Sequence, residues 1–215
     1  MSNVPCLCAW DVIIFKFIIM ESAISNETVV NLLQDLGIDA SYSSASLQSL
    51  AAVNSRYLKD MKLNVSSTLG SNNLTRKEAY LLALAVVINE KNDILIGAFE
   101  KLAIKEGATA EEIAETHGCA SLMGINNIFY RFRHFMNDVE FYNKQPAGLR
   151  MSLMLNPVMG KGLFELMSLV VSAVNGCEKC VVSHEHSVKE QGADEPRIYD
   201  AIRLGAVIEG LCTII

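Results

Sequence analysis

Two cysteines separated by two residues, Cys177 and Cys180, are the side chains of this sequence best suited to chemistry, and His184 follows them by one helical turn. At the start of a helix, unpaired N–H groups and the helix dipole favour a thiolate over a thiol. At about 100° per residue, the three side chains share one face of the helix. His184 can therefore accept the proton of Cys180 or hold its thiolate as an ion pair. This pattern predicts a redox-active dithiol.

Glu165 is a candidate for moving the proton further. It opens a segment that is otherwise almost wholly apolar, so we expect its carboxylate to be pressed against the core, with its pKa raised into a range useful for proton transfer. The alternative is an ordinary glutamate that the helix dipole favours near an N-terminus. Spacing alone leaves both interpretations open.

Zinc binding is the competing interpretation of the same segment, with Cys177, Cys180, His184 and His186 as four possible ligands. His186 lies about 180° around the helix from Cys177, so only three of the four side chains can converge. The other cysteines form no regular framework with this pair, which argues against a disulfide scaffold; they are Cys6, Cys8, Cys119 and Cys212. We expect no metal.

The charge of the chain argues against a nucleic-acid partner, and its hydropathy pattern argues against a membrane or signal segment. The net charge of -6 argues against nucleic acid, because phosphate binding needs concentrated Lys and Arg. Residues 9–20 are apolar, but they are fewer than the roughly 20 needed to span a bilayer and include Asp11 and Lys16. No basic segment precedes them, as a signal peptide would require. We expect a cytoplasmic protein without a membrane segment, with Met20 as the physiological start and residues 1–20 as a non-native or disordered extension.

Apolar residues at spacings of three and four, together with only four prolines, predict an all-α fold of about eight helices. Capping boxes are expected at Thr75 with Glu78 and at Thr109 with Glu112. Ser66 to Asn73 is predicted to be a polar loop, and Asp138 to Gly148 a connection. The expected helices cover 26–37, 44–63, 92–107, 109–135, 161–174, 177–191 and 195–211, together with one that starts at the Thr75 box and includes the apolar run 81–88.

An internal repeat is visible when Glu78 is laid over Glu165, because each opens a long apolar helix. We expect a single domain over 21–215, with a first repeat at about 75–135 and a second at about 161–215. In this register the first repeat has no thiol chemistry, and it would serve as scaffold. Its residues matching Cys177, Cys180 and His184 are Glu90, Asp93 and Gly97.

Three blocks of sequence, 123–135, 148–157 and 164–188, resemble the AhpD family, the alkyl hydroperoxide reductase adaptors of the carboxymuconolactone-decarboxylase-like superfamily. The third block is the most specific, since it combines the glutamate, the CxxC pair and the following histidine. The resemblance implies a duplicated all-helical fold, usually a homotrimer. It also implies reduction of alkyl hydroperoxides or electron transfer to an AhpC-type peroxiredoxin. The implied reductant is a dihydrolipoyl group on a lipoyl-bearing protein, with no tightly bound cofactor.

Carried over by position, Cys180 resembles the peroxide-attacking thiol, Cys177 the thiol that closes the disulfide, and Glu165 with His184 the proton relay. Helix-dipole reasoning alone would favour Cys177 as the attacking residue. One departure is Lys179, where well-known members have histidine, and a lysine does not easily shuttle protons at neutral pH. The alternatives are a carboxymuconolactone decarboxylase-like enzyme, which needs no cysteine pair, and a zinc-stabilised helical binding module.

Overall fold

The structure is a computed structural model that describes residues 26–215. The expected start at Met20 and the extension over 1–20 lie outside the described residues. By its internal contacts the chain forms two compact units, one reaching Leu63 and including Thr213–Ile215, the other covering Asn64–Cys212. The expected single domain over 21–215 stays a prediction.

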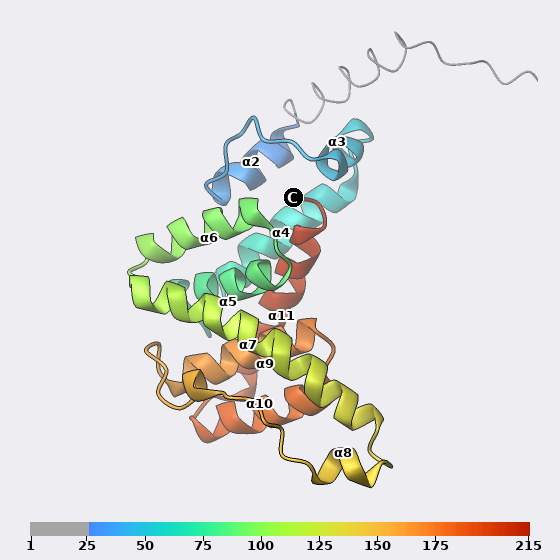
Figure 1. Ribbon diagram of the computed structural model, residues 1–215. Helices are drawn as coiled ribbons and strands as arrows, with labels where there is room; N and C mark the ends of the chain where they lie inside the picture. Colours follow the sequence, from blue (N-terminus) through green and yellow to red (C-terminus); the bar gives the residue numbers. More distant parts are fainter. Residues whose placement is uncertain (1–25) are drawn as a thin grey trace, which may run out of the picture. The chain divides into compact units, whose positions relative to one another are not determined.

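The described residues form ten α-helices, one short 3-10 helix and no strand, which confirms the all-α fold (Figure 1). Most of the expected helices are found within one or two residues of their predicted bounds. In chain order the elements are α2 Glu27–Asp35, α3 Ala45–Ala52, α4 Arg56–Leu69, α5 Arg76–Asn89, α6 Asp93–Lys105, α7 Ala110–Phe135, α8 Glu140–Lys144, η1 Ser152–Met154, α9 Lys161–Val174, α10 Glu178–Glu190 and α11 Glu195–Cys212.

Side-chain caps account for most of the agreement. Asn26 accepts hydrogen bonds from the backbone at the start of α2, and both predicted capping boxes are present at the starts of α5 and α7. Each box satisfies two backbone N–H groups that a helix start leaves unpaired. The positions at which these helices begin therefore follow from local sequence.

Two stretches differ from expectation. The helix predicted over 44–63 is two helices, because Asn54 has a φ of 47° and interrupts the chain between α3 and α4. The polar loop predicted from Ser66 is wrong at its start, since α4 continues to Leu69. Thr68 explains the error: its hydroxyl donates to the Asn64 carbonyl at 2.8 Å, so this polar residue is satisfied inside a helix.

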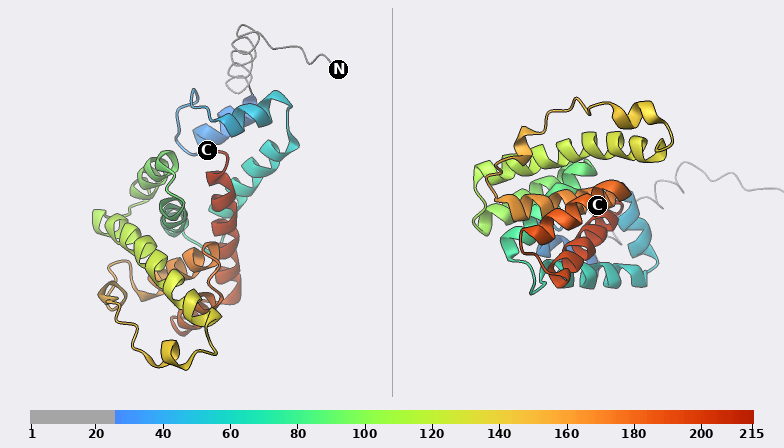
Figure 2. Two further views of the ribbon diagram at one scale, coloured as in Figure 1. Left: turned by 45° about the vertical axis from the view of Figure 1, so that its right-hand side comes forward. Right: turned by 90° about the horizontal axis from the view of Figure 1, so that it is seen from below.

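The core of the second unit is built on α5 and α9, which are buried on nearly all faces. A helix that is apolar all round must be enclosed by other elements. Both α7 and α11 pack against α5 and against α9, while α10 packs against α9 and α7. In Figures 1 and 2, α7 (yellow-green) runs alongside α9 and α10 (orange). This packing brings residues of α7, α9 and α10 to one place.

The second unit contains the same arrangement of three consecutive helices twice. The starts of α5, α6 and α7 at residues 76, 93 and 110 recur at 161, 178 and 195 in α9, α10 and α11, a constant shift of 85 residues. Turn glycines obey the same shift, since Gly107 and Gly192 both have positive φ, 86° and 89°. The predicted register, which laid Glu78 over Glu165, is two residues off. It matched residues by type, whereas the helix caps define the true correspondence.

With the shift of 85, Tyr80 corresponds to Glu165 and Phe99 to His184. The Tyr80 and Phe99 rings contact each other, with centroids 6.4 Å apart. An apolar ring pair in α5 and α6 thus occupies the positions at which α9 and α10 carry an acid and a base. With the same shift, Cys177 and Cys180 correspond to Asn92 and Leu95, so the first repeat has no thiol at these positions, in agreement with the prediction that only the second repeat carries thiol chemistry.

Gly205 tests the packing of α11 against α9. A Cβ atom at this position would lie 2.5 Å from Cγ1 of Val170, a stiff β-branched side chain that is buried in α9. We therefore expect Gly205→Ala to lower the free energy of unfolding by about 1–3 kcal/mol in urea titrations, through overpacking. In α6, Gly97 has nothing within 4 Å of such a Cβ, so Gly97→Ala should instead stabilise by about 0.5–1 kcal/mol. Equal effects of the two changes would contradict this packing.

Candidate active site

Cys177 and Cys180 form a disulfide, with their Cα atoms 5.3 Å apart. Cys177 is the N-cap residue of α10, and Cys180 lies in its first turn, where the helix dipole favours negative charge. Gly176, at a φ of 65°, makes the turn that leads from α9 into this cap. The predicted pair is therefore close enough to bond, and α10 places it where a thiolate is stabilised.

The two sulfur-bearing residues differ in access. Cys177 is 0% exposed, whereas Cys180 is 6% exposed and lines a cavity of about 310 Å³. His184 lines the same cavity. The remaining walls combine apolar and polar groups; they are Asn126, Tyr130, Met151, Met154, Lys179 and Ser183. A small molecule in this cavity meets Cys180 rather than Cys177.

Glu165 and His184 form a buried pair. His184 Nδ1 lies 2.6 Å from one carboxylate oxygen of Glu165, and the other oxygen lies 2.8 Å from Nζ of Lys161, one turn earlier in α9. Burial acts to raise the pKa of Glu165, but the hydrogen bonds and charges of His184 and Lys161 outweigh it and hold the pKa below its ordinary value. The expectation of a raised pKa is therefore wrong, because sequence reasoning did not include Lys161.

The ionised carboxylate orients the histidine. An ionised carboxylate only accepts hydrogen bonds, so Nδ1 of His184 carries the hydrogen and donates to Glu165. In the neutral form of the ring Nε2 is therefore the unprotonated nitrogen, and it makes no hydrogen bond with another described residue. Glu165 is thus suited to fixing the imidazole tautomer, as carboxylates beside histidines commonly do.

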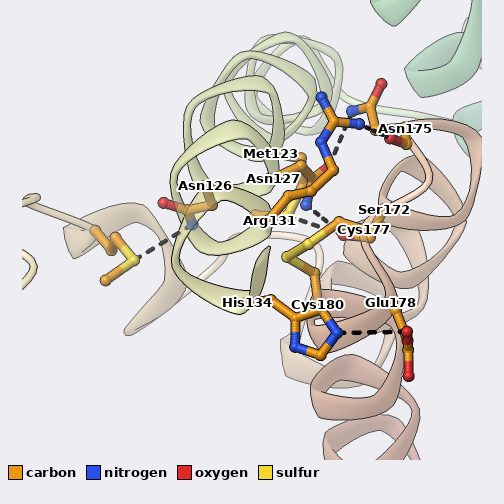
Figure 3. Close-up of a disulfide and its surroundings, with 11 residues drawn as sticks. Met123, Asn126, Asn127, Arg131, His134, Ser172, Asn175, Cys177, Glu178 and Cys180 are labelled. Carbon is orange, nitrogen blue, oxygen red and sulfur yellow. Dashed lines mark hydrogen bonds and ion pairs between the residues drawn. A yellow bond between two sulfur atoms is a disulfide. The ribbon is translucent and has the colours of Figure 1, made fainter. Parts of the chain in front are cut away.

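The turn that carries Cys177 is held by hydrogen bonds that the sequence did not suggest. Arg131 of α7 donates to the Asn175 carbonyl at 2.6 Å, and the Asn175 side chain donates to Asn127 at 2.9 Å. Asn127 in turn donates to Ser172 at 2.9 Å. Figure 3 shows Arg131, Asn127 and Asn175 around the disulfide. Arg131 of α7 therefore helps to hold the turn that carries Cys177.

A second imidazole, that of His134, belongs to the surroundings of the disulfide (Figure 3). His134, near the end of α7, lies 3.5 Å from the carboxylate of Glu178, the first residue of α10 (Figure 3). His134 is 40% exposed and Glu178 is 77% exposed, so this ion pair contributes little to stability. It does leave Glu178 paired with α7 rather than with its neighbour Lys179.

Two charged side chains, Glu115 and Lys161, hold the segment that contributes Met154 to the cavity wall. Glu115 of α7 is buried and accepts the backbone N–H groups of Val158 and Met159, both at 2.8 Å. Lys161, which pairs with Glu165, also donates to the Met154 carbonyl at 2.8 Å. The turn that contributes Met154 to the cavity is therefore anchored at both ends. Lys161 could have been found from its i,i+4 spacing to Glu165, whereas Glu115 carries no local signal.

Neither His186, the remaining predicted ligand, nor the thiol of Cys119 lines the cavity at Cys180. His186 is 75% exposed and pairs with Glu190, so it does not join His184. Cys119 is sealed in the core, where burial raises the pKa of its thiol to about 12. Cys6 and Cys8 lie outside the described residues. Within residues 26–215, no group of three or more His, Cys, Asp or Glu is placed to hold a metal ion.

A family model described as the carboxymuconolactone decarboxylase family matches residues 142–214, which include the whole CxxC segment. The chain is also similar to proteins named alkyl hydroperoxide reductase AhpD. That of Streptomyces coelicolor is 37% identical over 166 residues, 77% of this chain and 92% of its own length. Those of Bradyrhizobium sp. (strain ORS 278) and Mycobacterium tuberculosis are each 36% identical, covering 87% and 92% of their own lengths and 74% and 77% of this chain.

These matches place the chain in the class of helical proteins related to carboxymuconolactone decarboxylases. Because relatives above 30% identity are covered over most of their length, the chain belongs to the AhpD family. Among the described helices none is both long enough and apolar enough to cross a bilayer.

The low pKa of Glu165 makes stability depend on pH in a defined direction. A carboxyl group whose pKa is depressed on folding stabilises the fold above its unfolded pKa, about 4.3, and this contribution is lost as pH falls through the folded value. The oxidised wild type should therefore lose more unfolding free energy between pH 7 and pH 3 than Glu165→Gln does. Urea titrations at both pH values measure this, and parallel losses would contradict it.

Proposed function

We propose that this chain is a thiol-disulfide oxidoreductase that reduces alkyl hydroperoxides through the Cys177–Cys180 pair. The observation that carries the proposal is a disulfide whose outer sulfur-bearing residue lines a cavity together with His184. The names of the relatives support an alkyl hydroperoxide reductase-type function. Both lines of support concern the same segment, since the family match includes the pair.

In the proposed cycle, Nε2 of His184 takes the proton of the Cys180 thiol, and the thiolate attacks the outer oxygen of the hydroperoxide. A sulfur–oxygen bond forms, the oxygen–oxygen bond breaks, and the alkoxide leaving group takes the proton from His184 to give an alcohol. The Cys177 thiol then condenses with the Cys180 sulfenic acid, which releases water and closes the disulfide. The cavity supports Cys180 as the attacking residue, because Cys177 is wholly buried.

A dithiol must return the two electrons, and we propose a dihydrolipoyl group on a carrier protein. One of its thiolates attacks Cys180, Cys177 leaves as a thiolate, and the second thiol of the donor resolves the mixed disulfide. The N-terminal end of α10 favours the departing charge on Cys177. The same exchange can instead run toward the disulfide of an AhpC-type peroxiredoxin. A cytoplasmic setting suits this cycle, since a reducing compartment keeps dithiols available.

A homotrimer is the proposed assembly, and an exposed apolar stripe supports it. The second half of α7 exposes apolar side chains at spacings of three and four, and α8 continues the surface. We call this set the α7–α8 patch; its residues are Ile125, Ile128, Phe132, Phe135, Val139 and Phe141. A contiguous apolar surface of this kind marks an interface more often than a solvated face.

A decarboxylase-like reaction is the alternative from the same superfamily. It needs no cysteine pair, so alkylation of the reduced protein separates the two. Loss of peroxide consumption after alkylation of Cys177 and Cys180 supports the redox cycle. Unchanged turnover of a lactone acid by the alkylated protein would favour the decarboxylase.

The order of the two cysteines can be tested in single turnovers. Reduced Cys177→Ser should still consume one equivalent of cumene hydroperoxide and form a sulfenic acid that dimedone traps, because Cys180 is intact. Cys180→Ser should lose at least a factor of about 100 in the rate of peroxide consumption, since the attacking group is gone. Mass spectrometry of the dimedone adduct identifies the residue. Trapping at Cys177, with activity kept by Cys180→Ser, would reverse the assignment.

The assembly is tested by a charge placed in the α7–α8 patch. Phe135 is 69% exposed, so Phe135→Asp should leave the helices intact but shift the mass measured by light scattering from trimer toward monomer. Ile104 of α6 is 58% exposed and lies outside the patch, so Ile104→Asp is the matched control and should keep the trimer. A wild type that is monomeric at micromolar concentration would refute the proposed assembly.

A further inference from the structure

The proposed cycle gives no role to Lys179, the residue immediately before Cys180. Lys179 is exposed and lines the same cavity as Cys180 and His184. Its ammonium group makes no hydrogen bond or ion pair with another described residue. The nearest acid in sequence, Glu178, is paired with His134 of α7. The residue next to the reacting cysteine therefore carries an unpaired ammonium group.

The rest of the cavity lining lets Lys179 favour anionic ligands. The chain has 24 acidic and 18 basic residues, yet no acidic residue lines this cavity. Glu165 lies behind His184, and its charge is balanced by Lys161. Most surfaces of a protein with net charge -6 repel anions, but this cavity presents an unpaired ammonium group.

The other walls suit the apolar body of a substrate. Met151, Met154 and the ring of Tyr130 line the cavity, and thioether side chains adapt to irregular apolar shapes. An occupant with its hydroperoxide at Cys180 would lie along these side chains. A negatively charged end would then be within the range of the flexible lysine stem.

From this arrangement we propose that Lys179 binds the carboxylate of the substrate, so that the preferred substrates are hydroperoxides with an apolar body and an anionic end. This inference rests on the proposed function. The chemistry at Cys180 is unchanged: the oxygen–oxygen bond breaks, the sulfenic acid forms and the alcohol leaves, while Lys179 exchanges neither protons nor electrons. Its role is to determine specificity.

A pair of substrates that differ only in charge tests the proposal. Cumene hydroperoxide is neutral, and its para-carboxylate analogue adds one anionic group to the same body. With the uncharged donor dithiothreitol, wild type should show a KM about fivefold lower for the carboxylate, the range expected for one partly exposed ion pair. Raising the salt concentration should weaken this preference by screening. Lys179→Met should abolish it, so that the ratio of the two KM values falls to about one.

Lys189 gives a matched control on the same helix. It lies in the last turn of α10, is paired with Glu185 and Glu195, and does not line the cavity. Lys189→Met should therefore keep the wild-type preference. An equal loss for both hydroperoxides in Lys179→Met would overturn the proposal, because it would assign Lys179 to thiolate stabilisation. Equal KM values in wild type would also overturn it, whereas failure of wild type to consume either hydroperoxide would instead refute the proposed function.

Discussion

The arrangement of the site depends on one buried carboxylate that stays ionised. Glu165 lies in α9, a helix that is apolar on nearly every face, where an unpaired charge would be costly. Lys161 and His184 each bind one of its oxygens, so the charge is compensated within a few ångströms. Because the carboxylate accepts from Nδ1, the other nitrogen of His184 is the acceptor in the neutral form of the ring. The tautomer of His184 at the cavity is therefore decided by Glu165, a residue that does not line the cavity.

The two copies of the three-helix unit differ in whether they carry a charge at these positions. At the corresponding positions of the first copy, Tyr80 and Phe99 make an apolar contact between α5 and α6. The same backbone geometry thus accommodates either a ring pair or an acid and a base. The first copy has the apolar ring pair. The central helices α5 and α9, one from each copy, both pack against α7 and α11. Stability and chemistry are divided between two copies of one unit.

Much of the fold could be predicted because its signals are local. The capping boxes at Thr75 and Thr109 define where α5 and α7 begin, and both were predicted correctly. The interruption at Asn54 was missed because the apolar spacing continues across it. Cys177, Cys180 and His184 lie together on α10, as the helical spacing predicted, whereas the contact between Glu165 and His184 joins two helices and was suggested only by the family resemblance.

Long-range contacts account for what local sequence did not indicate. The pKa of Glu165 was expected to rise from burial alone, although the i,i+4 spacing of Lys161 is a local signal for the ion pair that helps to lower it; His184, the other partner, lies 19 residues away on α10. Arg131 binds a carbonyl 44 residues away, a contact that no local pattern indicates. Glu115 holds a turn more than 40 residues further along the chain. Such partners are close only after α7 has packed against α9.

The complete burial of Cys177 affects the timing of the proposed cycle. An oxidised Cys180 has its reaction partner already beside it, so closure of the disulfide is a first-order event whose rate does not depend on the concentration of thiols outside. A second peroxide molecule must arrive by diffusion before it can oxidise the same sulfur further. At low peroxide concentration the internal reaction wins this competition, and the burial of one sulfur thereby protects the other from irreversible damage.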